Sequence, residues 1–486
     1  MTFRFRRVGL VVTAAAIAMA AISVLAYRPI RKAFHGTAFE TELRRVKYRL
    51  QDLGRTSAKC ESTDAAAPAP NVVLIALDTL RADHLGMYGY SRPVSPALDA
   101  LARDSVVFSS AIAPAPWTLP SFAGVLTGFH PAALGILNEP KPLPPEATTL
   151  GEALCERGFQ TAGVISHLFV GSTYSFDRGF ERWDQSNVGG HAYVSSAKVT
   201  DKATAFLDEF EDDRPFFLFT HYFDAHYDYM EHAEFPYSKE GASAVRSQGN
   251  NIVELQRLAS SGQLDEESRN YLVDCYDSEI AFMDQQIGRL IDHLKATDRY
   301  DDTLIVVVAD HGEMFAERED RWIGHTRYVY DSLVRVPLLL KLPQSRITRT
   351  VTAAVSTVDV RATVLEAVGD PSADPRRTLL RSLTQPAEPV FSQTRRGAKL
   401  DTVVHEGWKL IMEYETGELE LYNIAQDPEE KQNLVESNGA VAARLEPLIV
   451  DWLEEIDFQP QRFTRTTSPV LSEGEVQRLK SLGYAD

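Results

Sequence analysis

Four short apolar segments recur along this chain, and a helical stretch separates each from the next. The segments are VVLIAL, AGVISH, FFLFTHYF and TLIVVVA, at residues 72–77, 162–167, 216–223 and 303–309. Apolar runs of this length that alternate with helices are typical of parallel strands buried on both faces. Helices are expected at residues 95–103, 149–157, 199–210 and 267–294. The pattern predicts an α/β fold with a parallel sheet flanked by helices.

Polar side chains follow three of these runs. Asp78 comes directly after the first, His226 lies just beyond the third, and Asp310 and His311 follow the fourth. In open α/β sheets the ligand site lies at the carboxyl ends of the strands. Carboxylate oxygens and imidazole nitrogens are ligands for divalent metals. A single Asp after a strand is more often a turn former or a helix cap, but several together predict a metal site at this edge.

The segment PAPWTLPSFAGVLTG, residues 114–128, provides a candidate nucleophile in Thr118. Pro120 suits the first turn of a helix, which is expected to run to Gly128. Thr118 would then lie at the positive end of that helix. A threonine hydroxyl is a weak nucleophile, but a metal ion and a helix N-terminus both stabilise its anionic form. The competing interpretation is that Thr118 is a simple N-cap.

Several segments resemble the ordered motifs of the sulfatase family, which belongs to the alkaline-phosphatase superfamily. They are NVVLIALDTLRADHLGMYGY, APWTLPSFAGVLTG, FFLFTHYFDAHYDY and ADHGEMFAEREDRWIGH, at residues 71–90, 115–128, 216–229 and 309–325. The tail, with ELYNIAQDPEEKQNL at 420–434 and a closing LKSLGY, is similar to the family too. The resemblance implies an α/β fold of the alkaline-phosphatase/sulfatase type, with a mixed, mostly parallel sheet flanked by helices and a smaller C-terminal antiparallel-sheet subdomain.

The nucleophile motif departs from that of the family. Sulfatases carry C-x-P-S-R and oxidise the Cys to formylglycine, whereas this chain has Thr118-Leu119-Pro120-Ser121-Phe122. Threonine cannot form the aldehyde, and Phe122 replaces the arginine. A Thr in this position resembles the phosphodiesterase and phosphoethanolamine-transferase branches. By that resemblance the metal ligands are Asp78, Thr118, Asp310 and His311.

The identity of the metal follows from two further differences. Sulfatases typically have a second Asp where Thr79 stands and an Asn where His311 stands, which suits calcium. The imidazole of His311 favours zinc or manganese over calcium or magnesium. His226 and His325 match family histidines that contact the anionic oxygens of the substrate or hold a second metal. Thr118, His226 and His325 are therefore the candidate catalytic residues.

Four other polar residues near these motifs, His221, Asp224, Arg81 and His84, are expected to support the site rather than react. The resulting prediction is a metal-dependent hydrolase that cleaves sulfate or phosphate esters through a Thr nucleophile and a covalent intermediate. Its substrate would be a small anionic ester, a glycan or a lipid head group. The alternatives are a phosphoethanolamine-transferase-like phosphotransferase and a catalytically silent, anchored binding domain.

Residues 8–27 form a run of twenty residues without a formal charge, flanked by arginines. At ~1.5 Å per helical residue this run can span a bilayer. We expect residues 1–35 to be a membrane anchor, with a cleaved signal peptide and a buried core helix as alternatives. The resemblance to envelope enzymes implies a single-pass protein with an extracytoplasmic catalytic domain, although the flanking charges do not favour export.

Composition divides the rest of the chain. Residues 36–70 read as a helical stalk and a linker, residues 71–384 as the catalytic domain, and residues 385–486 as a C-terminal subdomain of short alternating segments. Residues 1–60 hold twelve Lys or Arg and three Asp or Glu, so the remainder carries −27 of a total net charge of −18. A body this acidic repels polyanions and makes nucleic acid an unsuitable partner.

Overall fold

The computed structural model describes residues 69–188, 195–226, 229–238, 245, 251–319, 321–458 and 463–481. The expected anchor of residues 1–35, and all but the last two residues of the expected stalk and linker, lie outside this set. Among the residues described, no helix combines the length and the apolar character that crossing a membrane requires.

An eight-stranded mixed sheet forms the centre of the molecule, in the order β12-β2-β11-β7-β1-β6-β4-β5. The central strand β1 runs parallel to β6 and β7, whereas β11 is antiparallel to β7 and β2. All four apolar runs singled out in the sequence are strands of this sheet, and β6 and β7 are buried along their whole length. The strands are β1 (Asn71–Leu77), β2 (Val106–Phe108), β4 (Gln160–Val164), β5 (Arg182–Asp184), β6 (Phe216–Tyr222), β7 (Thr303–Ala309), β11 (Leu338–Lys341) and β12 (Arg349–Val351).

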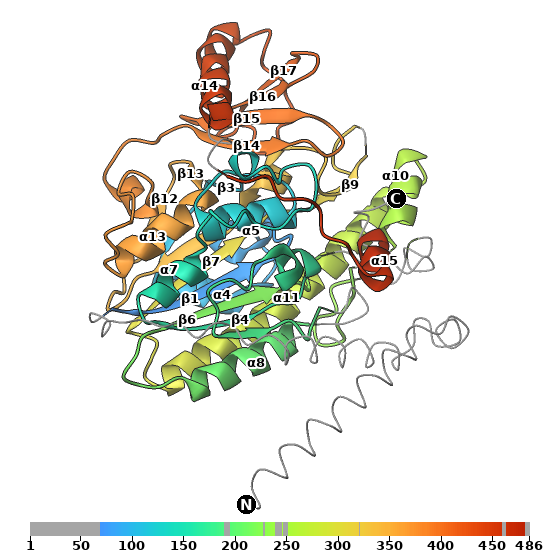
Figure 1. Cartoon of the computed structure of the whole chain (residues 1–486). Coiled ribbons are helices and arrows are strands. Elements are labelled where there is room, and N and C mark those ends of the chain that lie inside the picture. The colour runs from blue at the N-terminus through green and yellow to red at the C-terminus, as the bar shows by residue number, and fades with distance from the viewer. Residues whose placement is uncertain are drawn as a thin grey trace, which may run out of the picture.

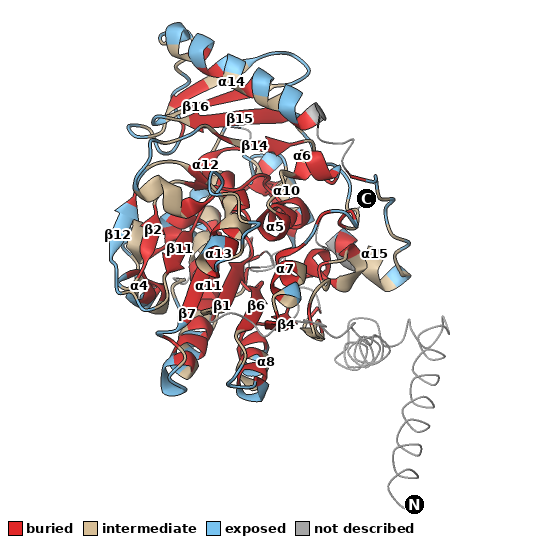
Figure 2. Ribbon diagram, turned by 60° about the vertical axis from the view of Figure 1, so that its left-hand side comes forward, coloured by how far each residue is buried: buried red, intermediate tan, exposed pale blue. Residues whose placement is uncertain are grey.

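Helices cover both faces of this sheet. Figure 1 shows α8 and α11 on one face and α5 and α7 on the other, and the central strands between them are buried (Figure 2). The helix α7 begins with the capping box of Thr149 and Glu152, in which each side chain accepts a backbone N–H. The expected helices agree with the observed ones to within a few residues. The main helices are α4 (Pro96–Ala102), α5 (Thr118–Thr127), α7 (Leu150–Glu156), α8 (Ser196–Glu209), α11 (Glu266–Ala296) and α13 (Val360–Ala367).

A separate four-stranded antiparallel sheet follows near the C-terminus, in the order β14-β15-β16-β17. It lies above the main sheet in Figure 1, and one long helix, α14, packs on it through Leu445 and Ile449. The turn between β16 and β17 contains Gly417, whose φ is a positive 72°. Together the two sheets confirm the predicted fold class. The elements are β14 (Val390–Thr394), β15 (Leu400–His405), β16 (Trp408–Glu413), β17 (Leu419–Asn423) and α14 (Gly439–Phe458).

A buried ion cluster joins this second sheet to the main body. Lys409 on β16 places its Nζ 2.7 Å from Oδ1 of Asp331 and 2.8 Å from Oε1 of Glu430. Asp331 belongs to the short helix α12 (Asp331–Val334) of the main body. All three side chains are buried, so their charges are neutralised within the protein.

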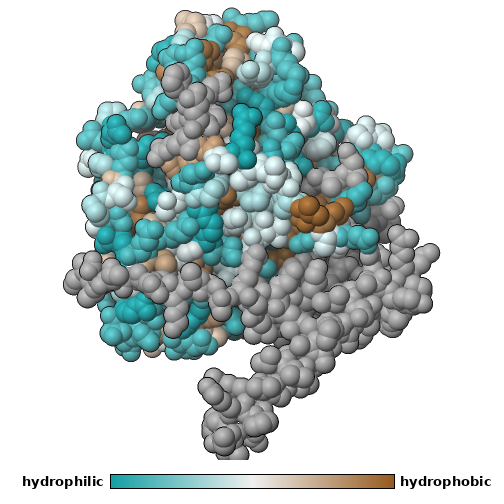
Figure 3. All heavy atoms as spheres, viewed as in Figure 1, coloured by the Kyte–Doolittle hydropathy of each residue, from teal (hydrophilic) through white to brown (hydrophobic). Residues whose placement is uncertain are grey.

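The surface contrasts with this interior. Figure 3 shows that the side turned to the viewer is mostly hydrophilic, which agrees with the high content of charged residues. Only scattered large apolar side chains of the described residues are exposed, and single exposed residues of this kind are normal for a folded protein. They are Val253, Ile347, Tyr414, Val450 and Val470.

Candidate metal centre and nucleophile

The ends of β1 and β7 bring two carboxylates together. In the parallel pair Leu77 stands opposite Ala309, so the next residues, Asp78 and Asp310, leave the sheet side by side. The backbone N–H of Asp310 donates to the carbonyl of Leu77 at 3.2 Å, which holds the two strand ends together. Both carboxyl groups are fully buried. The convergence predicted from the strand ends is therefore present.

Asp78, Asp310 and His311 each offer one atom to a group whose members lie within 4.8 Å of one another. Nε2 of His311 is 3.4 Å from Oδ2 of Asp310 and 3.8 Å from Oδ1 of Asp78. Nδ1 of His311 faces the carbonyl of Gly312 at 2.9 Å and must donate to it, so Nε2 carries the lone pair. Three acceptor atoms thus converge, and this donor set can hold a divalent metal.

The electrostatics of this group also fit a cation. Burial, together with neighbouring carboxylates, raises the pKa of Asp78 and of Asp310 well above the ordinary value. Burial likewise lowers the pKa of His311, so its ring stays neutral. Both oxygens of Asp78 and Oδ2 of Asp310 accept no hydrogen bond within the described part of the chain. A bound cation would satisfy these oxygens and reverse the cost of burying their charge.

Thr118 lies at the start of α5 and faces the same group. Its Oγ1 is 3.4 Å from Nε2 of His311, and the side chain is fully buried. The N-cap is Trp117, and no side chain caps the helix, so the alternative of Thr118 as a simple N-cap is wrong. Ser121 on the first turn donates its hydroxyl to the carbonyl of Asp310 at 2.7 Å, which fixes the helix end against β7. As expected, α5 ends at Gly128, whose φ is 73°.

The rings of two further histidines, His325 and His226, lie one after the other beside His311. The ring centroids of His311 and His325 are 4.3 Å apart, and those of His325 and His226 are 4.9 Å apart. Nδ1 of His325 lies 3.0 Å from Oε1 of Glu313, and both side chains are buried. Burial, and then the charge of Arg396, lower the pKa of His325 to about 3. Burial raises the pKa of Glu313 well above normal, so both groups are neutral and the proton between them lies on the Glu313 carboxyl.

Another imidazole approaches Asp78 from the opposite side. Nε2 of His221, at the end of β6, is 3.3 Å from Oδ2 of Asp78, and Nδ1 of His167 is 3.8 Å from the same oxygen. The ring of Phe122, the residue that replaces the family arginine, meets His221 edge to face at 5.1 Å. Sequence reasoning placed His221 in a supporting role and did not find His167.

The other three supporting residues lie outside the metal group. Asp224 accepts from the backbone N–H groups of Ser195 and Ser196 and so caps α8. Arg81 pairs with Asp83 at 2.7 Å and donates to the carbonyl of Glu313 at 2.9 Å, which fixes the backbone beside His325. His84 pairs with Asp277 at 2.7 Å.

Sequence reasoning also missed Glu313 and Arg396. Glu313 belongs to the motif that begins at Asp310, but only its distance to His325 reveals its partner. Arg396 follows β14 in the C-terminal subdomain, and its guanidinium carbon lies 4.6 Å from the centre of the Trp117 ring. Trp117 precedes Thr118 directly, so the second sheet contributes a cation to the surroundings of the nucleophile. Nothing local in the sequence around Arg396 indicates this contact.

The family is identified by direct comparison. The sulfatase family model matches residues 70–370, which is more than half of the chain. The chain therefore belongs to the sulfatase family of the alkaline-phosphatase superfamily and so to a class of sulfuric and phosphoric ester hydrolases. The family predicted from its motifs is confirmed.

Similar proteins include two curated sulfatases. The ulvan-active sulfatase of Formosa agariphila is 26% identical over 322 residues, which cover 61% of this chain and 61% of that protein. An uncharacterized sulfatase of Escherichia coli is 23% identical over 443 residues, covering 80% of this chain and 88% of the relative. Among solved structures, the phosphonate monoester hydrolase of Agrobacterium radiobacter has a TM-score of 0.64 at 20% identity, covering 80% of this chain and 96% of that one. This last likeness supports the fold.

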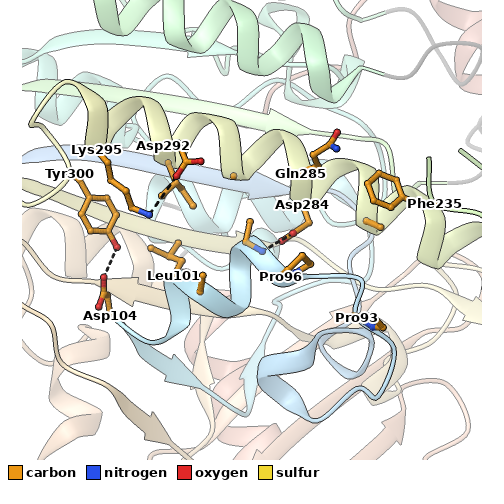
Figure 4. Close-up of a pocket in the computed structure, with 15 residues that line it drawn as sticks. Pro93, Pro96, Leu101, Asp104, Phe235, Asp284, Gln285, Asp292, Lys295 and Tyr300 are labelled. Carbon is orange, nitrogen blue, oxygen red and sulfur yellow. Dashed lines mark hydrogen bonds and ion pairs between the residues drawn. The ribbon is translucent and has the colours of Figure 1, made fainter. Parts of the chain in front are cut away.

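A cavity of about 480 Å³ lies away from this centre, between α4 and α11. Figure 4 shows Asp284 reaching across it to the N-terminus of α4, where it accepts from the backbone N–H groups of Ala97 and Leu98 at 2.8 Å. Its lining is mainly apolar and includes none of the predicted site residues. The carboxylate of Asp284 therefore serves as a helix cap.

Proposed function

We propose that this protein is a metal-dependent hydrolase that cleaves sulfate or phosphate esters with Thr118 as its nucleophile. One observation carries the proposal. A threonine hydroxyl at a helix N-terminus lies 3.4 Å from a neutral imidazole nitrogen that also faces two buried carboxylates. Among the described residues no lysine or arginine pairs with Asp78 or Asp310, so a bound cation would stabilise their ionised forms.

Asp78, Asp310, His311 and Thr118 would hold the ion, with zinc or manganese preferred because of the imidazole. A divalent ion there would lower the pKa of the Thr118 hydroxyl and offset negative charge on the substrate oxygens. The N-terminus of α5 adds its partial positive charge at the same point. A second ion at His226 and His325 stays a prediction.

The reaction proceeds in two displacements. In the first, Oγ1 of Thr118 gives up its proton and forms a bond to sulfur or phosphorus while the bond to the leaving oxygen breaks, and that oxygen takes up a proton from His325. In the second, a water attacks the same sulfur or phosphorus, releases sulfate or phosphate and restores the Thr118 hydroxyl. Because Thr118 cannot form the aldehyde used by sulfatases, its ester must be cleaved by attack at sulfur or phosphorus.

The remaining site residues would stabilise charge on the substrate and transfer protons. His226 would contact the oxygens of the transferred group, and His325 would assist the leaving oxygen. The carboxyl of Glu313, 3.0 Å from Nδ1 of His325, holds that ring in place and can return the proton that His325 gives up. Arg396 lies on the same side and would attract an anionic substrate.

A sulfated glycan, a small anionic ester or a lipid head group is the proposed substrate. Relatives named an ulvan-active sulfatase, an N-acetylglucosamine-6-O-sulfatase and a choline-sulfatase support this range. We further propose that residues 8–27 anchor the protein in a membrane, with its catalytic domain on the extracytoplasmic side. The apolar length of that segment supports the anchor.

A panel of 4-nitrophenyl sulfate, phosphate and phosphodiester, offered to wild type, Thr118→Ala and Thr118→Ser, tests the proposal. Wild type loaded with zinc or manganese should turn over at least one substrate. Thr118→Ala should lose about 10³-fold or more in kcat, as expected when the nucleophile is removed. Thr118→Ser keeps the hydroxyl and should retain part of the activity. Equal turnover by Thr118→Ala and wild type would refute the role of Thr118.

The product separates hydrolysis from transfer. Free sulfate or phosphate supports the hydrolase, whereas a modified acceptor alcohol without free product would identify a transferase. No turnover of any substrate by metal-loaded wild type would support the silent binding domain.

A further inference from the structure

The backbone on both sides of His325 adopts the left-handed conformation. Gly324, before it, has a φ of 104°, and Thr326, after it, has a φ of 80°. Glycine adopts such a conformation without strain, whereas a β-branched residue such as threonine is an outlier there. Strained conformations of this kind persist only where the surrounding structure enforces them, and they concentrate at active sites. The groups that hold Thr326 therefore bear on how His325 is placed.

Two hydrogen bonds to distant parts of the chain hold Thr326. Its N–H donates to the carbonyl of Pro116 at 2.9 Å, two residues before Thr118. Its carbonyl accepts from Oγ1 of Thr394 at 2.5 Å, and this buried threonine is the last residue of β14. The carbonyl of Arg396 lies 3.5 Å from the same hydroxyl, so the single hydroxyl proton is donated to Thr326 instead.

From this geometry we infer that Thr394 is a positioning residue for the reaction: its hydroxyl holds Thr326 in the left-handed conformation and thereby aims the ring of His325 at the leaving oxygen. The inference rests on the proposed function in one respect, the role of His325. In this position Nδ1 of His325 lies 3.0 Å from Oε1 of Glu313, and the ring lies 4.3 Å from that of His311. The second sheet thus acts on the reaction through His325.

The same end of β14 also holds the segment before the nucleophile. The N–H of Gln393 donates to the carbonyl of Pro114 at 3.0 Å, four residues before Thr118. In an in-line displacement the attacking and leaving oxygens stand on opposite sides of the transferred group. The separation of Thr118 from His325 must therefore be fixed. Since β14 is bonded to the segments of both residues, it can fix that separation.

A contact that only joined the two sheets would not explain this arrangement. The buried cluster of Lys409 already joins the second sheet to the main body. A threonine held at positive φ raises the free energy of the folded state, and a glycine at position 326 would avoid that strain. The strain is explained if the direction of His325 matters for function.

The dependence of the rate on the leaving group tests the inference, because a proton from His325 matters most for a poor leaving group. Full-length wild type, Thr394→Val and Thr394→Ser are assayed with 4-nitrophenyl and phenyl sulfate and with the same pair of phosphates. In Thr394→Val, kcat should fall about 10–100-fold for the phenyl ester and less than about threefold for the 4-nitrophenyl ester. Thr394→Ser keeps the hydroxyl and should restore most of the lost rate.

Thr402→Val is the matched control. The hydroxyl of Thr402 donates to the carbonyl of Leu410 at 2.9 Å within the same sheet, and Thr402 is as buried as Thr394. Its loss should lower stability to a similar extent and leave the ratio of the phenyl and 4-nitrophenyl rates unchanged. The NMR signal of the His325 ring, identified by its absence from His325→Gln, gives a measurement independent of activity. That signal should shift in Thr394→Val and stay in place in Thr402→Val.

An unshifted His325 signal in Thr394→Val, or equal losses of kcat with both leaving groups, would overturn the inference and leave the role of Thr118 intact. Absence of turnover by wild type would instead overturn the proposed function, while a shifted signal would still support the placement of His325 by Thr394. Thermal denaturation checks that each variant is folded, and Thr394→Ala replaces Thr394→Val if the valine prevents folding.

Discussion

Two clusters of buried carboxylates in this molecule are neutralised in different ways. At the junction of the two sheets, Asp331 and Glu430 share the ammonium group of Lys409 at 2.7 and 2.8 Å. At the ends of β1 and β7, Asp78 and Asp310 have imidazoles beside them and backbone N–H groups donate to Oδ1 of Asp310, but no lysine or arginine of the described residues pairs with them. The first cluster carries its own cation, whereas under the proposed function the second receives one from solution.

This difference distinguishes a structural contact between the two sheets from a candidate binding site. A buried carboxylate without a cation costs several kcal/mol, and a fixed lysine offsets that cost permanently. A lysine in the second cluster would occupy the point where Thr118 and the substrate must meet. Leaving the carboxylates unpaired makes the apo site unfavourable, and binding of a metal recovers that energy.

Removal of the metal should have the largest effect, and it should act on the cluster of Asp78 and Asp310 and leave that of Lys409 unchanged. Chelation should abolish turnover and lower the melting temperature, because an ion at 1,000 times its Kd contributes about 4 kcal/mol to the free energy of unfolding. Calorimetry with and without chelator measures this. In Asp310→Asn the shift should be much smaller, and an equal shift in that variant would place the stabilising ion elsewhere.

Loss of Lys409 should lower the free energy of unfolding by nearly as much as removal of the metal, and the loss should not depend on metal. Lys409→Met removes the cation and leaves Asp331 and Glu430 buried without it, which should lower the free energy of unfolding by about 3–5 kcal/mol. Denaturant unfolding measures the loss, and it should be the same with and without chelator. The exposed Lys399, which pairs with Glu415 at the surface, is the matched control, and Lys399→Met should cost at most about 1 kcal/mol.

A change of pH should give the smallest effect, and at the ends of β1 and β7 it should act through metal binding. Burial raises the pKa of Asp78 and of Asp310, so protons compete with the metal as pH falls. Metal affinity should drop by up to about tenfold per pH unit for each proton displaced. Two acidic neighbours raise the pKa of Lys409 despite its burial, so its contribution is present below its unfolded pKa and is lost only above its raised folded pKa. Metal titrations at pH 6 and 8 test this, and equal affinities would contradict it.

Much of the fold could be predicted because its signals are local. The run TLIVVVA coincides with β7, and the other three runs match strands to within a few residues. Asp78 and Asp310 could be placed together because parallel strands end at the same edge of a sheet. Thr118 followed from a helix signal and a resemblance. The pairing of Glu313 with His325 and the approach of Arg396 to Trp117 have no local signature, since each joins residues that meet only after folding.

The alternation of apolar runs and helices, and the residues placed after each run, determined by themselves that this chain forms an α/β sheet with carboxylate and imidazole groups at one edge. Periodicity and strand ends depend on neighbours in the chain, which the sequence contains directly. Tertiary structure alone decided that Lys409 neutralises Asp331 and Glu430, and that Asp78 has no lysine or arginine partner among the described residues. Those outcomes depend on distances of a few ångströms between segments far apart in the chain, where one proton or one lysine changes the charge balance of a buried group.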